Sequence, residues 1–172
     1  MQENILYFFK SHAHPLLDNF FIALTMLGEQ YFIILVVAWI YWNYSKKDGL
    51  LLTVIFIFST LINSVLKDIV RSQRPFQSLE GIEGKRVHTA GGYSFPSGHT
   101  QGATTLFITL ALIFRNRNFW IIAIILSLLV ALSRMYLGVH WPVDVMGALL
   151  FGTIISLVLY PWLNRLYLNK KS

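Results

Sequence analysis

Long apolar stretches, separated by short polar segments, restrict the fold of this chain more than any other feature. They cover residues 15–27, 30–43, 49–70, 97–114, 119–137 and 142–160. An α-helix needs about 20 mostly apolar residues to cross the hydrocarbon core of a membrane. Because 55% of the 172 residues are hydrophobic and only 13% are charged, the chain predicts an all-α membrane bundle with about six transmembrane helices.

The length of the chain is that of one domain, so residues 1–172 are expected to form a single integral-membrane unit. Residues 1–14 are amphipathic and are expected to lie at the membrane interface. They lack a basic start and a small-residue cleavage site, which predicts that no signal peptide is removed. The stretch 15–27 is short for a full crossing, and a tight turn is expected at Gly28 before the next one.

The positive charges predict an orientation in the membrane. Three basic segments are assigned to the cytoplasm, which places both termini there and puts loop 71–96 and the turn after Leu137 on the outer face. The three segments are Lys46 with Lys47, Arg115 with Arg117, and Arg165 with Lys170 and Lys171. The outer loop is itself basic, which counts against this assignment. The net charge of +6 forms no basic stripe, so no nucleic-acid partner is expected.

A polar segment ends in Pro96-Ser97-Gly98-His99, where the apolar run that follows should begin a helix. Pro96 suits the first turn, Ser97 is an expected N-cap, and Gly98 allows close approach to the backbone. The free N–H groups of such an end favour phosphate or carboxylate. His99 would stand at this anion-binding helix end.

Two further clusters of charge lie at the same predicted end of the bundle. Lys67 and Arg74 are seven residues apart and share a helical face if that helix continues, although Pro75 favours Arg74 curling back from the loop. The second cluster runs from Ser133-Arg134 to His140 and Asp144. Ionisable groups near membrane depth are functional candidates, and three cations beside a helix N-terminus suit a multiply charged anion such as phosphate.

Hydrolysis of a phosphoester needs a nucleophile and an acid for the leaving group, and two histidines on different helices can divide these roles. Asp144 is expected in the first turn of a helix begun by Pro142, within reach of His140. A carboxylate bonded to one ring nitrogen leaves the other free to attack, which favours His140 as nucleophile and His99 as acid. Spacing alone leaves the order open.

Together these clusters resemble the signature of the type 2 phosphatidic acid phosphatase superfamily. Its pattern reads Lys-x6-Arg-Pro, then Pro-Ser-Gly-His, then Ser-Arg-x5-His-x3-Asp, and the chain matches all three parts between Lys67 and Asp144. The small bacterial membrane members, phosphatidylglycerophosphate and undecaprenyl-pyrophosphate phosphatases, are the most similar in hydropathy. The resemblance implies a six-helix bundle and a lipid phosphate or pyrophosphate as substrate.

The resemblance also implies a phosphohistidine mechanism that uses no metal or other cofactor. His140 would attack phosphorus, Asp144 would orient it, and His99 would protonate the leaving oxygen and then activate water. The phosphate-binding groups would be Lys67, Arg74, Ser97, Gly98 and Arg134. The active site is expected on the outer face of the plasma membrane, with loop 76–93 as a possible lid.

Four other functions are weighed against this one. Ser97 could be the nucleophile of a serine hydrolase, although its surroundings are not the Gly-x-Ser-x-Gly elbow. His99 and His140 could be axial ligands of a haem. A membrane carrier could bind lipid phosphate or an ion without chemistry. A metal-dependent phosphatase is disfavoured because nearby cations would repel a metal ion. The lipid and the oligomeric state stay open.

Overall fold

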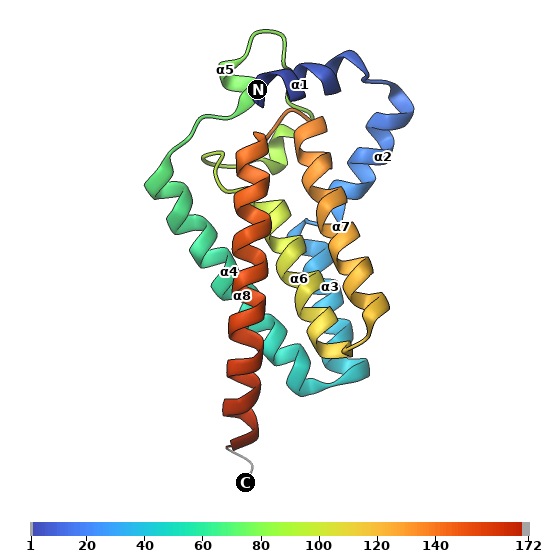
Figure 1. The fold of residues 1–172 in the computed structure, drawn as a ribbon, viewed down its shortest axis with the longest axis vertical. Helices are drawn as coiled ribbons and strands as arrows, with labels where there is room; N and C mark the ends of the chain where they lie inside the picture. The colour runs from blue at the N-terminus through green and yellow to red at the C-terminus, as the bar shows by residue number, and fades with distance from the viewer. Residues whose placement is uncertain (1, 170–172) are drawn as a thin grey trace.

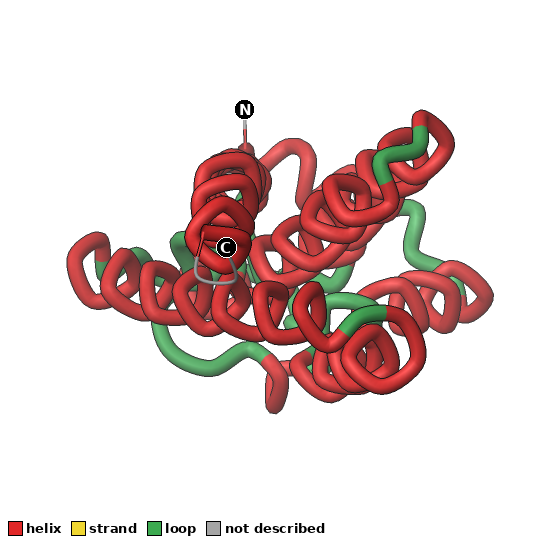
Figure 2. The backbone as a smooth tube through the Cα atoms, turned by 90° about the horizontal axis from the view of Figure 1, so that it is seen from below, coloured by secondary structure: helices red, strands yellow, loops and turns green. Residues whose placement is uncertain are grey.

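The computed structural model describes residues 2–169, and this part of the chain consists of helices and loops without a strand (Figure 2). Met1, Lys170 and Lys171, which belong to the expected interfacial segment and the C-terminal basic cluster, lie outside the described residues. The helices are α1 (Gln2–Ser11), α2 (Pro15–Met26), α3 (Gln30–Trp39), η1 (Ile40–Tyr44), α4 (Lys46–Val70), α5 (Pro75–Ser78), η2 (Val87–Thr89), α6 (Gly98–Phe114), α7 (Arg117–Tyr136) and α8 (Pro142–Asn169).

Local capping chemistry explains where the long helices begin. The hydroxyl of Ser97 accepts a hydrogen bond from the backbone N–H of Thr100 at 3.4 Å, so the predicted N-cap of α6 is confirmed. Pro142 is the first residue of α8, as expected. Pro96 is not in the first turn of α6, which begins two residues later; that detail of the prediction is wrong.

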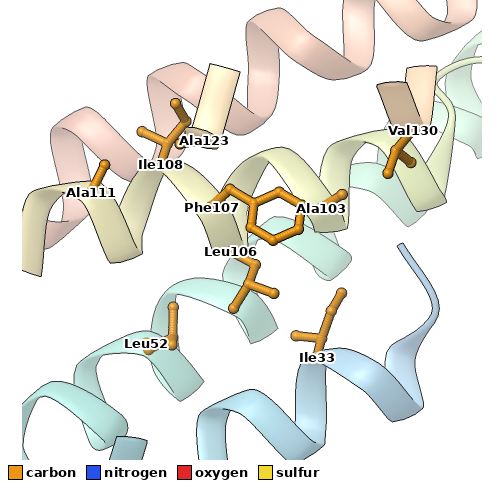
Figure 3. Packing of buried hydrophobic residues seen from close by; sticks show 9 residues of the cluster. All are labelled: Ile33, Leu52, Ala103, Leu106, Phe107, Ile108, Ala111, Ala123 and Val130. Carbon is orange, nitrogen blue, oxygen red and sulfur yellow. The ribbon is translucent and has the colours of Figure 1, made fainter. Parts of the chain in front are cut away.

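Helix α6 lies at the centre of the bundle and packs against α4, α7 and α8 (Figure 1). Its Leu106 is fully buried among side chains of the neighbouring helices, including Ile33 of α3 and Leu52 of α4 (Figure 3). A Cβ on Gly152 of α8 would stand 2.9 Å from the carbonyl oxygen of Gln101, so this glycine allows α8 to approach α6 closely. The buried position of α6 fixes the depth of its N-terminal residues, including His99.

Three helices of the described chain are long and apolar enough to cross a membrane: Lys46–Ser78, Arg117–Tyr136 and Pro142–Asn169. Large apolar side chains such as Ile124 and Leu157 are exposed on them, which suits contact with lipid. Helix α6 has 17 residues and is shielded by the others. The expected count of about six spans is therefore approximate.

The N-terminal helices α2 and α3 are one reason why the number of spans differs from the expected six. Pro15–Met26 and Gln30–Tyr44 pass the spanning test only together, and they are bent by 50° at the break between them. The expected reversal at Gly28 is wrong because α2 and α3 continue in the same general direction (Figure 1). A Cβ on Gly28 would lie 2.6 Å from the carbonyl oxygen of His99, so the break is packed against the start of α6.

This continuation also corrects the expected orientation of the ends. The two termini lie at opposite ends of the bundle, with α1 at the end that carries loop 71–96 (Figure 1). The phenol of Tyr7 donates to the carbonyl oxygen of Glu80 at 3.1 Å, which ties α1 to that loop. The prediction that both termini share one side is therefore wrong.

Candidate active site

The residues of the three sequence clusters meet at the end of the bundle that carries loop 71–96. Helix α4 supplies Lys67, α6 supplies His99, and the α7–α8 turn supplies His140. The ionisable groups near enough to act electrostatically on His99 are Arg134, His140, Arg86 and Arg74. Those that act on Lys67 are Arg74, Asp144 and Arg134. The sequence clusters thus form one site, and Arg86 of the loop joins them.

His140 is oriented through one of its two ring nitrogens. Its Nδ1 lies 3.3 Å from Oδ2 of Asp144 and 3.4 Å from the hydroxyl of Ser94. Ser94 also donates to the same carboxylate oxygen at 2.5 Å, and the backbone N–H of Trp141 donates to it at 2.8 Å. A carboxylate on Nδ1 favours the tautomer in which Nε2 is unprotonated. The expected contact between His140 and Asp144 is confirmed.

Burial controls the protonation of this histidine. Only 1% of the surface of His140 is exposed, and Arg134, Arg74 and Lys67 lie around it. Burial first, and then the charge of these cations, lower the pKa of His140 well below the ordinary value of 6.5. The ring is therefore neutral at physiological pH, which a nucleophile requires.

Arg74 uses all of its guanidinium donors in this site. Its Nη1 lies 3.2 Å from Nε2 of His140, and its other N–H groups donate to backbone carbonyl oxygens at 2.8 to 3.2 Å. These carbonyls belong to Gly91, Gly92, Tyr93 and Val139. Lys67 also donates to the carbonyl of Tyr93. Helix α4 ends at Val70, so Arg74 reaches the site by curling back from the loop, the second of the two expected routes.

Arg134 differs from Arg74. Its side chain is fully buried at the end of α7, and Nη1 donates to the hydroxyl of Thr25 at 2.7 Å. Its Nε and Nη2 have no hydrogen-bond partner within residues 2–169. Nε2 of His99 is likewise buried without a hydrogen-bond partner among these residues. Buried donors without partners are costly, and together these atoms favour an anion as ligand.

Ser97 and Gly98 lie at the N-terminus of α6, beside these groups. The backbone N–H of Ser97 donates to the carbonyl oxygen of Asp144 at 3.1 Å, which joins the start of α6 to the start of α8. A Cβ on Gly98 would meet only Oδ1 of Asn63, at an ordinary distance of 3.5 Å. The backbone at Gly98 is thus open to a ligand, as the sequence predicts.

The sequence reasoning did not find Ser94 and Thr25. Ser94 is fully buried and contacts both Asp144 and His140, while Thr25 of α2 holds Arg134. Ser94 lies three residues before the predicted N-cap, which could have drawn attention to it. Thr25 had no local signal, because it lies 109 residues from Arg134.

The side chains of the site are a poor set of ligands for a metal ion. No group of three or more His, Cys, Asp or Glu side chains within residues 2–169 is arranged to hold one. The carboxylate of Asp144 is surrounded by Lys67, Arg74 and the ring of His140. This set of groups suits a phosphate better than a cation.

A cavity of about 540 Å³ opens beside His99. Its walls come from the α2–α3 break, α4, η2 and the start of α6. Glu29 and His88 line it on the loop side, and Phe56 and Ile33 line it on the helix side. The cavity thus joins a polar end at His99 to apolar walls, a combination that suits a lipid with a charged headgroup.

Comparisons with known proteins agree with this architecture. Residues 48–168 match the family model of the PAP2 superfamily. The undecaprenyl-diphosphatase BcrC of Bacillus subtilis is 34% identical over 156 residues, which cover 87% of this chain and 77% of that protein. Phosphatidylglycerophosphatase B of the same organism is 31% identical over 155 residues, covering 82% and 72%.

A solved structure has the same fold. The crystal structure of a transmembrane PAP2-type phosphatidylglycerolphosphate phosphatase from Bacillus subtilis superposes with a TM-score of 0.80. The sequences are 26% identical, and the alignment covers 95% of this chain and 85% of that one.

Proposed function

As a member of the PAP2 superfamily this chain is a membrane lipid phosphatase, and we propose that it removes the terminal phosphate of a lipid phosphate or pyrophosphate through a phosphohistidine. The candidate substrates are undecaprenyl pyrophosphate and phosphatidylglycerophosphate. Two relatives that are at least 31% identical to this chain are named as phosphatases of these lipids. The roles given below to individual residues are part of the proposal.

The observation that carries the proposal is the distribution of unpartnered polar atoms. Five buried side-chain atoms of the described chain have no hydrogen-bond partner. They are Arg86 Nε, His99 Nε2, Arg134 Nε, Arg134 Nη2 and Asp144 Oδ1. All five belong to the site or to the loop above it, and a phosphate would supply oxygen acceptors for the arginine donors.

The first chemical step is attack by Nε2 of His140 on phosphorus. Asp144 accepts the hydrogen bond from Nδ1–H of His140 and stabilises the ring as it becomes positively charged. The bond from phosphorus to the leaving oxygen breaks, and its electron pair stays on that oxygen. His99, which takes up a proton from solvent when the anionic phosphate enters the site, donates that proton to the leaving oxygen. Arg134, the Ser97–Gly98 backbone and Lys67 hold the equatorial phosphate oxygens. Arg74 also binds them once it exchanges its contact with His140 for the phosphate.

The second step releases phosphate. His99, now unprotonated, takes a proton from water as the water oxygen attacks phosphorus, and the P–N bond to His140 breaks. Inorganic phosphate leaves, and His140 regains its neutral form. Each histidine thus returns to its starting protonation state, and the cycle consumes one water molecule and no cofactor.

The proposed side of the membrane is the outer face of the plasma membrane. The bundle end opposite the site carries the start of α4, the turn between α6 and α7, and the C-terminal part of α8 (Figure 1). These segments contain Lys46, Lys47, Arg115, Arg117 and Arg165, and such basic segments favour the cytoplasm. The N-terminus, at the other end, would then be outside. Labelling of single cysteines placed at positions 3 and 164 with a membrane-impermeant maleimide tests this orientation, and labelling of position 164 alone in intact cells would contradict it.

The test of function is phosphate release by the detergent-purified chain in the presence of a chelator. Undecaprenyl pyrophosphate, phosphatidylglycerophosphate and phosphatidic acid are compared, with His140→Ala and the matched surface variant His12→Ala. We expect His140→Ala to lose at least about 10⁴-fold in kcat. His12 is exposed in the turn that follows α1, so His12→Ala should retain activity.

Three results would contradict the proposal. Lipid binding without phosphate release would indicate the carrier that the sequence left open. Equal activity in His140→Ala would exclude the phosphohistidine. Loss of activity in the chelator, restored by added metal, would show that a metal ion takes part. Acid-quenched enzyme should carry labelled phosphate only when His140 is present.

A further inference from the structure

Arg86 is the one basic residue near the site that the mechanism above does not use. Its Nη2 donates to Oε1 of Glu29 at 2.5 Å, and its Nε is buried without a partner within residues 2–169. The residue adopts a left-handed backbone conformation with φ of 55°, which is uncommon for a non-glycine residue. The loop therefore holds this guanidinium in place at some conformational cost.

The position of Arg86 relates it to the cavity beside His99. Its ion-pair partner Glu29 lines that cavity, and so does His88, two residues further along the loop. Arg86 is near enough to act electrostatically on both His99 and Arg134. The cavity thus has His99 at one side and Glu29 at another, and Arg86 stands behind Glu29 without lining the cavity itself.

The chemistry of the proposed mechanism gives this cavity a role. His99 delivers its proton to the leaving oxygen, so the leaving group lies on the His99 side of the transferred phosphate. The cavity is on that side, and its apolar walls suit a lipid chain. A cation held beside this cavity through Glu29 would stabilise a leaving group that carries negative charge there.

We propose that Arg86 and the cavity beside His99 form a subsite for a second phosphate on the leaving group, so that the preferred substrate is a lipid diphosphate. This inference rests on the proposed function. In such a substrate the bond from the terminal phosphorus to the bridging oxygen breaks, and its electron pair stays on that oxygen. The leaving group is a lipid monophosphate, whose growing negative charge Arg86 stabilises.

Glu29 has the opposite effect in this arrangement. Its carboxylate holds Arg86 in the absence of substrate, and it repels a second phosphate that enters the cavity. The phosphate competes with Glu29 for the guanidinium, and the unpartnered Nε is available to it from the start. Removal of the Glu29 charge should therefore favour diphosphates, while removal of the Arg86 charge should disfavour them.

Lys85 provides a matched control on the same loop. Its ammonium group lies 2.5 Å from Oδ1 of Asp18 and 5.6 Å from the centre of the Tyr136 ring. Its partner Asp18 does not line the cavity, whereas Glu29, the partner of Arg86, does. Lys85→Gln removes one positive charge from the loop without touching the proposed subsite.

The experiment compares farnesyl diphosphate with farnesyl monophosphate, which differ only in the second phosphate. Phosphate release by the detergent-purified full chain is measured for wild type, R86Q, E29Q, E29Q/R86Q and K85Q. We expect R86Q and the double variant to lower the diphosphate-to-monophosphate ratio of kcat/KM at least tenfold, mainly through KM. E29Q should raise this ratio, and K85Q should leave it unchanged.

The double variant keeps the test valid if R86Q alone folds poorly, because it leaves no unpaired carboxylate at position 29. An unchanged ratio in both R86Q and the double variant would overturn the subsite. Wild type that prefers the monophosphate would overturn it as well, while leaving the phosphatase intact. Wild type that releases phosphate from neither lipid would contradict the proposed function itself.

Discussion

The two halves of the site are built in different ways. The half that we propose to hold the nucleophile, made of Arg74, Ser94, His140 and Asp144, is closely hydrogen-bonded within the protein. The half that we propose to face the leaving group, made of Arg86, His99 and Arg134, contains four of the five unpartnered buried side-chain atoms found within residues 2–169. Both halves are rich in cations, so charge does not distinguish them. The halves differ in whether other protein groups satisfy the hydrogen-bonding capacity of their polar side chains.

This difference indicates how each half is prepared for substrate. The nucleophile half is rigid, since the tautomer and direction of the His140 ring are fixed before a ligand arrives. The leaving-group half keeps donors that no protein group within residues 2–169 satisfies. The two halves should therefore respond in opposite ways when an arginine is removed from each.

The largest effect should come from replacing the two buried arginines. Arg74→Met and Arg134→Met should each lower kcat/KM by about 10² to 10³-fold, because each removes a positive charge from the transferred phosphate. Stability should separate them. Arg74→Met leaves several backbone carbonyls without donors and should destabilise the fold by about 3 kcal/mol or more.

Arg134→Met removes a buried charge with unpartnered donors, so thermal stability should be unchanged or higher. Thermal unfolding in one detergent measures the contrast. Equal losses of stability in the two variants would show that the halves are not built differently.

A smaller effect is expected for Ser94→Ala in the nucleophile half. The variant loses the hydrogen bond from Ser94 to Asp144, and Trp141 still donates to the same oxygen. A charge-assisted hydrogen bond contributes about 1.5 to 3 kcal/mol, which corresponds to a decrease in kcat of about 10- to 100-fold.

Because Ser94 acts through Asp144 and not on the substrate, KM should not change. Ser94→Thr, which keeps the hydroxyl, should restore part of kcat. A change in KM alone would mean that Ser94 contacts the lipid instead.

The smallest effect concerns pH. Burial lowers the pKa of His140 below 6.5, so the nucleophile stays unprotonated in mildly acidic solution. The acidic limb of kcat/KM should then lie well below pH 6.5. Below that pH the unfolded chain binds a proton that the folded chain does not, so stability should decrease as the pH falls. An acidic limb at the ordinary histidine value would show that the ring is more solvated than its burial indicates.

Much of the site could be predicted because its signals are local. The N-cap Ser97, the helix start at Pro142 and the contact between His140 and Asp144, four residues apart, follow from short-range rules. The apolar runs likewise predicted the long helices, although α4 begins at Lys46 and not at Gly49. There, the N-cap Ser45 starts the helix within a segment expected to be a polar link.

The other features of the fold and the site depend on contacts between residues far apart in the sequence, which no local sequence pattern predicts. A short polar break such as Gly28-Glu29-Gln30 looks the same in a chain that reverses and in one that only bends. Packing of Gly28 on the backbone of His99, far along the chain, selects the bend. The same holds for Thr25 on Arg134 and for Glu29 on Arg86, which is 57 positions away.

The bend between α2 and α3 has a consequence for the order of biosynthesis. Asp18 and Glu29 carry charges in or beside this broken span, and their partners Lys85 and Arg86 are made 67 and 57 residues later. A charged side chain without a partner is costly in lipid. We therefore expect the N-terminal pair of helices to complete its ion pairs only after the ribosome has delivered the loop, which follows α4 in the chain.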